Sequence, residues 1–158
     1  MTRSLAVFLA AAGSAALLAG AFAFQYIGGL APCHLCLLQR WPHAAAVVIG
    51  MSALLITYRP LGWLLPLLGA VAAGTTAALG LYHTGVERHW WQGPNTCTAG
   101  DISAMNVGDL TDQLLANTTV VQCDQVAWAM AGLSMASWNM VVSLGLVGLW
   151  LVAAQKSR

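Results

Sequence analysis

The sequence predicts an all-α membrane protein, a four-helix transmembrane bundle with one long loop on its outer side. Of its 158 residues, 59% are hydrophobic and only 7% are charged, against about 25% charged residues in soluble proteins. So few charges do not cover a soluble globule, whereas a bilayer requires apolar side chains on the outside. The formal net charge of +1 and the lack of any Lys/Arg run argue against nucleic-acid binding.

Four apolar segments are long enough to cross a bilayer, which takes about 20 residues of helix. These predicted spans are residues 5–24, 41–58, 61–82 and 136–154. Every backbone donor in lipid must be paired internally, so the segments are expected to be helices rather than open strands. No linker suggests a second domain, and residues 1–158 are predicted to form a single membrane domain.

The first span also resembles a secretory signal peptide. Arg3 precedes its apolar run, and the small-residue pattern Ala21-Phe22-Ala23 lies near its end. The hydrophobic region of a signal peptide is usually about 7–15 residues long. Because this run is longer, we expect it to remain in place as the first span.

The basic residues are divided unequally between the two ends of the spans. One end carries Arg3, Arg59, Lys156 and Arg158, and the other carries Arg40 and Arg88. The positive-inside rule makes the richer end cytoplasmic, with both termini. The loops at 25–40 and 83–135 then lie outside, which in a bacterial inner membrane is the periplasm. All four cysteines lie in these loops, where disulfides form and persist.

Two of the cysteines form a CxxC motif, Cys33-His34-Leu35-Cys36, immediately before a predicted helix. At a helix N-terminus the backbone N–H groups and the helix dipole stabilise a thiolate and raise its reactivity. A zinc ribbon requires a second close CxxC, and c-type haem requires His where this chain has Leu37. A redox-active pair is therefore favoured, with no metal; zinc and an inert bridge remain the alternatives.

The other two cysteines, Cys97 and Cys123, lie in the long outer loop. A disulfide between them would close a large loop and contribute about 3–4 kcal/mol in the chain-entropy model. Taken alone, this pair is better interpreted as a structural bridge. Between the two cysteines, the apolar spacing within 107–115 predicts a short amphipathic helix on the membrane surface.

Two polar residues at the outer ends of the spans have two interpretations each. Arg40 follows Cys36 by four residues, so a helix starting near Cys36 would place both on one face. There the guanidinium would stabilise a thiolate or a reduced organic acceptor, but it could equally extend to lipid phosphates. Pro42 would kink this helix or set its start. His83, alone, is more simply an interfacial residue than a ligand.

Three motifs carry a resemblance to a known family. They are Cys33-His34-Leu35-Cys36-Leu37-Leu38-Gln39-Arg40, Tyr82-His83-Thr84-Gly85-Val86-Glu87 before Trp90-Trp91, and Cys123 with Trp128 and Gly132-Leu133-Ser134-Met135. Together with four spans, they resemble the DsbB family of bacterial inner-membrane disulfide-bond formation proteins. The resemblance covers nearly the whole chain. Where the family often has Pro after this Met, the chain has Ala136.

The resemblance implies a relay of two electrons. A Cys97–Cys123 disulfide would oxidise a soluble DsbA-like partner of thioredoxin fold, with Cys97 forming the mixed disulfide. Cys33 and Cys36 would reoxidise that pair and reduce ubiquinone or menaquinone, with Cys36 facing the quinone. Arg40, His83 and Met135 match positions that support or line the quinone site. The direction of electron flow is taken from the family.

Two other functions remain open at this stage. A vitamin K epoxide reductase-like enzyme shares four helices, paired cysteines and a quinone, but its quinone-side CxxC lies near the end of a late span. A structural membrane protein would use both cysteine pairs only as staples. A channel or transporter is disfavoured because the spans hold almost no charge to line a path. The oligomeric state is not indicated.

Overall fold

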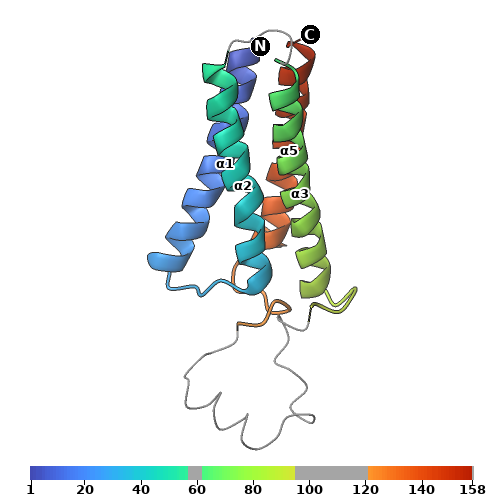
Figure 1. Cartoon of the computed structure of the whole chain (residues 1–158). Coiled ribbons are helices and arrows are strands. Elements are labelled where there is room, and N and C mark those ends of the chain that lie inside the picture. The colour runs from blue at the N-terminus through green and yellow to red at the C-terminus, as the bar shows by residue number, and fades with distance from the viewer. Residues whose placement is uncertain (57–61, 95–120, 158) are drawn as a thin grey trace, which may run out of the picture.

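The computed structural model describes residues 1–56, 62–94 and 121–157, and in this part of the chain four long helices pack as a bundle (Figure 1). They are α1 (Arg3–Tyr26), α2 (His34–Leu55), α3 (Leu64–Glu87) and α5 (Met135–Gln155). Helices α1 and α3 each pack against both α2 and α5. The two termini lie at one end of the bundle, and α2 starts at the other (Figure 1). The predicted all-α bundle is confirmed.

Three of these helices, α1, α3 and α5, are long and apolar enough to cross a membrane, judged by length and composition. Helix α2 does not meet the same measure, which differs from the four apolar spans predicted. Helix α2 is less apolar because three polar residues, Gln39, Arg40 and His43, all lie in its first half. Gln39 and His43 are buried within the bundle, and a membrane helix tolerates polar side chains there.

The helices extend beyond the predicted apolar spans at the cysteine end. Helix α2 begins at His34 instead of Trp41, and it continues through Pro42. A proline removes the backbone hydrogen bond to the residue four positions earlier and its ring crowds that carbonyl, but the helical turns before it are held by a cap at Cys33. Helix α3 continues to Glu87 instead of ending at Tyr82. The end of an apolar run is therefore not the end of a helix.

A small hairpin that was not predicted leads into α5. Strands β1 (Ala129–Met130) and β2 (Leu133–Ser134) are antiparallel, and Ala131 and Gly132 in the turn both have positive φ, 52° and 77°. Two such residues suit a tight two-residue hairpin turn. Ser134 then caps α5, because its hydroxyl accepts a hydrogen bond from the backbone N–H of Ser137. The helix therefore starts at Met135 although no proline follows.

The apolar core lies in the half of the bundle nearer the termini. All four helices contribute to it, mostly with alanine, and Trp150 of α5 is its largest fully buried side chain. Helix α3 passes close to this indole at Gly69, where an added Cβ would stand 2.5 Å from the ring. Small residues thus allow the helices to approach closely around one large side chain.

Some predictions fall on residues outside those the structure describes. They concern Cys97, the short amphipathic helix within 107–115 and the turn at Arg59.

Candidate functional site

Cys33 and Cys36 lie at the N-terminus of α2, as predicted. Cys33 is the N-cap, and its sulfur accepts a hydrogen bond from the backbone N–H of Cys36 at 3.2 Å. Both cysteines are free thiols, and the Cys33 thiol donates to Cys36 Sγ over 2.8 Å. This hydrogen bond, together with burial, raises the pKa of the Cys33 thiol. Cys33 therefore keeps its proton and shares it with Cys36, whose sulfur is the acceptor.

The ligand atoms of Cys33, Cys36 and His83 all lie within 4.8 Å of one another, a grouping that could hold a metal ion. Two thiolates on one tetrahedral zinc, at about 2.3 Å each, have their sulfurs about 3.8 Å apart. The 2.8 Å between these two sulfurs is much shorter. The arrangement suits the formation of a disulfide better than the sharing of a zinc ion.

A cavity of about 330 Å³ opens beside the two thiols. Apolar side chains of α1 form one wall, among them Leu17 and Phe24. Five residues singled out from the sequence line this same cavity: Cys33, Cys36, Arg40, His83 and Met135. The fold thus brings together residues from three helices that are far apart in the chain.

Arg40 is held on the α1 side of this cavity. Its Nη1 donates to Gln25 Oε1 at 2.6 Å, and its guanidinium carbon stands 4.9 Å from the centre of the Phe22 ring. Its Nε is buried and has no hydrogen-bond partner among the described residues. An unpaired buried donor is costly, so this N–H suits a ligand that brings an oxygen acceptor into the cavity.

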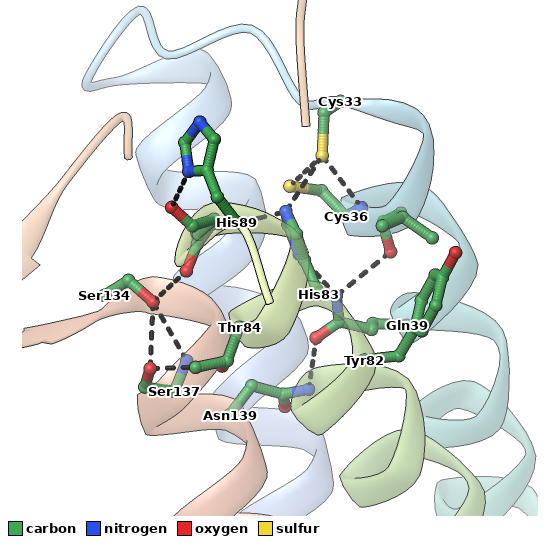
Figure 2. Close-up of polar contacts among 12 residues, drawn as sticks. Cys33, Cys36, Gln39, Tyr82, His83, Thr84, His89, Ser134, Ser137 and Asn139 are labelled. Carbon is green, nitrogen blue, oxygen red and sulfur yellow. Dashed lines mark hydrogen bonds and ion pairs between the residues drawn. The ribbon is translucent and has the colours of Figure 1, made fainter. Parts of the chain in front are cut away.

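His83 is buried, with only 4% of its surface exposed, and is not the interfacial residue expected from its position alone. Figure 2 shows its ring between Cys33 and Gln39. Nε2 lies 3.6 Å from Cys33 Sγ and 3.9 Å from Glu87 Oε1, while Nδ1 lies 3.0 Å from Gln39 Nε2. Because α3 continues past His83, the ring is turned into the bundle.

Cys123 is completely buried and lies in the same apolar cluster as Cys33, with Leu35 and Val86. It is disulfide-bonded. The loop cysteine is therefore packed beside the CxxC pair, while its predicted pairing with Cys97 lies outside the described residues.

Four polar residues at this site were given no role from the sequence, although Gln39 and Glu87 belong to the quoted motifs. The four are Gln39, His43, Glu87 and Asn139. Glu87 accepts a short hydrogen bond from Ser134, and Asn139 bonds to both Gln39 and His43. A signal was present for two of them, because His43 and Asn139 are polar residues inside predicted spans. Such residues usually face the bundle interior and mark functional sites.

Comparisons with known proteins identify the family of the chain. The family described as Disulfide bond formation protein DsbB matches residues 3–153. A Disulfide bond formation protein B of Hahella chejuensis is 30% identical over 92% of this chain and 88% of its own length. One of Methylococcus capsulatus is 35% identical over 84% and 82%. One of Azoarcus sp. is 32% identical over 98% and 93%.

No solved structure matches the chain. The family match covers nearly all of the chain, and the fold is a bundle of apolar helices with two free cysteines at one end. The chain belongs to the DsbB family of disulfide bond formation proteins, helical membrane proteins with disulfide oxidoreductase activity.

Proposed function

We propose that this chain is a protein dithiol:quinone oxidoreductase that reoxidises a periplasmic, DsbA-like oxidase of thioredoxin fold and passes the electrons to a membrane quinone. The observation that carries the proposal is the position of Cys33 and Cys36 on an apolar cavity between helices. A quinone is apolar and dissolves in the bilayer, so its site must be reached from lipid. A thiol pair that served only soluble proteins would not need such a cavity.

The first step is an exchange at the loop cysteines. A thiolate of the soluble partner attacks the Cys97–Cys123 disulfide at Cys97, forms a mixed disulfide and expels Cys123 as a thiolate. The partner's second thiolate then releases Cys97, so the partner leaves oxidised and the loop pair is reduced. Cys123 lies in one buried cluster with Cys33, which supports a second exchange between the two pairs.

The second step moves the electrons to the CxxC pair. Thiolates of the loop pair attack the Cys33–Cys36 disulfide, so the loop disulfide forms again and Cys33 and Cys36 become thiols. Reoxidation of these two thiols releases two electrons and two protons, and ubiquinone or menaquinone takes them up as the quinol. We assign the quinone-facing role to Cys36, because its sulfur accepts the hydrogen bond from Cys33.

Three residues would hold the quinone. Arg40 offers the unpaired Nε–H as a donor to a quinone oxygen, and His83 lies beside Cys33 as a second polar group. Met135, at the first position of α5, contributes a flexible apolar wall. A charged donor and an otherwise apolar lining fit a ring that carries oxygen atoms on an apolar body.

The orientation in the membrane follows from the charges. Arg3 and Lys156 lie at the ends of α1 and α5, which meet at the end of the bundle away from Cys33 (Figure 1). By the positive-inside rule, both termini would face the cytoplasm of a bacterium and the cysteines the periplasm. The protein would thus be a multi-pass protein of the bacterial inner membrane.

Two cysteine variants test the relay. Cys36→Ser removes the thiol that faces the quinone, so quinone reduction by the purified protein, followed as loss of quinone absorbance, should be abolished. Cys123→Ser removes the resolving thiol of the loop, so Cys97 should hold the reduced soluble oxidase as a mixed disulfide on a non-reducing gel. Ser52→Ala, on the exposed side of α2 near the other end, is the control and should behave as wild type.

The outcomes also separate the relay from a structural function. A protein whose cysteines are only staples would reduce no quinone, and its Cys123→Ser variant would trap no thioredoxin-fold partner. A vitamin K epoxide reductase-like enzyme also has its CxxC at the quinone, so it differs in the position of that motif, which here lies at the start of α2 and not near the end of a late span.

A further inference from the structure

Below the two thiols, a chain of buried and half-buried polar side chains connects three helices. It consists of Gln39 and His43 of α2, Thr76 and His83 of α3, and Asn139 of α5. Buried polar groups are costly unless they are hydrogen-bonded, and here nearly every one has a partner. The directions of these hydrogen bonds can be worked out, because two of the acceptors are backbone carbonyls.

The first acceptor of known direction is the backbone carbonyl oxygen of Leu35, which can only accept a hydrogen bond. The Gln39 atom that faces it at 3.1 Å must therefore be the amide nitrogen. The same nitrogen lies 3.0 Å from His83 Nδ1, so Nδ1 is an acceptor and carries no proton. The proton of neutral His83 is then on Nε2, the atom that faces Cys33 Sγ (Figure 2).

The other side of the Gln39 amide determines the state of His43. Gln39 Oε1 accepts from Asn139 Nδ2 at 2.6 Å, so the oxygen of Asn139 is the atom that faces His43 Nε2 at 2.8 Å. His43 must therefore donate from Nε2.

The second acceptor of known direction is the backbone carbonyl oxygen of Gln39, and it also requires His43 to donate from Nε2. The Thr76 hydroxyl donates to this carbonyl, which leaves its lone pairs for Asn139 Nδ2 and His43 Nε2. Two independent carbonyls thus place the His43 proton on Nε2.

With the proton on Nε2, His43 Nδ1 carries no proton and presents a lone pair that can accept a hydrogen bond. The side chain is only 3% exposed, it lines the same cavity as the thiols, and Nδ1 has no hydrogen-bond partner among the described residues. Seven residues of helix separate it from Cys36, about 10 Å along the axis. The cavity therefore offers donors near the thiols, from Arg40 and His83, and an acceptor deeper in the bundle.

We propose that His43 Nδ1 accepts a hydroxyl of the reduced quinone, so that the cavity holds the quinol more tightly than the quinone. A quinone has only acceptor oxygens, so it forms no hydrogen bond with the lone pair of Nδ1. A quinol has hydroxyl groups, and one of them satisfies this buried acceptor. The inference rests on the proposed quinone function and adds a second contact to that site.

Binding should be measured with both redox forms of one short-chain ligand, decylubiquinone and decylubiquinol. The full chain with Cys33→Ser and Cys36→Ser is used under anaerobic conditions, so that it cannot change the redox state of the ligand. Quenching of tryptophan fluorescence reports binding, because Trp128 and Trp138 line the cavity. His43→Phe in this background keeps a ring of similar size but removes Nδ1.

We expect His43→Phe to weaken quinol binding about tenfold, the effect of leaving one buried hydroxyl unpaired, and to leave quinone binding nearly unchanged. Equal loss of both forms, or no loss of either, would overturn the inference while leaving the quinone function in place. Failure of both forms to bind the protein with His43 intact would overturn the quinone function and the inference with it.

A second measurement does not depend on the variant being folded. In the chain with intact His43, labelled with ¹⁵N-histidine, NMR distinguishes the two neutral tautomers. We expect the Nε2–H form for His43 and His83, and a change at His43 Nδ1 on adding decylubiquinol but not decylubiquinone. A proton on His43 Nδ1 before ligand is added would contradict the assignment.

Discussion

The two halves of the bundle are built from different chemistry. The half near the termini is filled with alanine around Trp150, and its helices approach through glycine. The half near the cysteines contains a cavity of about 330 Å³ and a chain of buried and half-buried polar side chains. Close packing at one end holds the helices together, so that the other end can keep a cavity open between them.

The largest expected effect is on stability and lies in the terminal half. Trp150→Ala removes a fully buried side chain and should lower the free energy of unfolding by about 3–5 kcal/mol, as for large-to-small changes in other cores. Unfolding in detergent measures this loss. The quinone KM of the molecules that remain folded should not change; a raised KM with normal stability would remove the distinction between the halves.

The next effect is on function and lies in the cysteine half. Arg40→Leu should raise the quinone KM about tenfold to hundredfold, because a charge-assisted hydrogen bond is worth roughly 1.5–3 kcal/mol. Arg40→Lys should restore part of the loss, since it keeps the charge but not the planar guanidinium. Turnover is measured for the three proteins in the same detergent. Equal kinetics would leave Arg40 as an interfacial anchor and move the quinone elsewhere.

The smallest expected effect sharpens the comparison within the terminal half. Gly69→Ala places a Cβ 2.5 Å from the Trp150 ring, which should cost about 1 kcal/mol of stability through overpacking. Gly148→Ala is the matched control, because its Cβ would meet nothing within 4 Å in the described chain. Unfolding curves of the two variants should differ in midpoint. If they coincide, the terminal half is less tightly packed than the structure indicates.

The sequence was most informative where composition and spacing act locally. The low charge predicted the membrane bundle, and the CxxC motif predicted a cysteine pair at the start of a helix, since both depend on neighbouring residues. The i to i+4 spacing predicted that Arg40 and Cys36 share one face of a helix, and both residues line the cavity. Such local features require no knowledge of how the helices pack.

The polar chain below the thiols could not be predicted in the same way. Whether Asn139 meets His43 depends on how α5 packs against α2 and α3, and no local spacing determines that. His83 was expected at the interface because its apolar run ends there, but α3 continues to Glu87 and turns the ring inward. The hairpin before α5 was missed because Ala-Gly is a weak signal for a tight turn.

The central claim is that electrons pass from Cys33 and Cys36 to a quinone. The thiol state of the CxxC pair should be measured by alkylation in anaerobic membranes that contain the reduced protein, before and after quinone is added. Both thiols should be alkylated before quinone is added, and both should be protected as a disulfide afterwards. Thiols that stay reduced in the presence of quinone would contradict the claim.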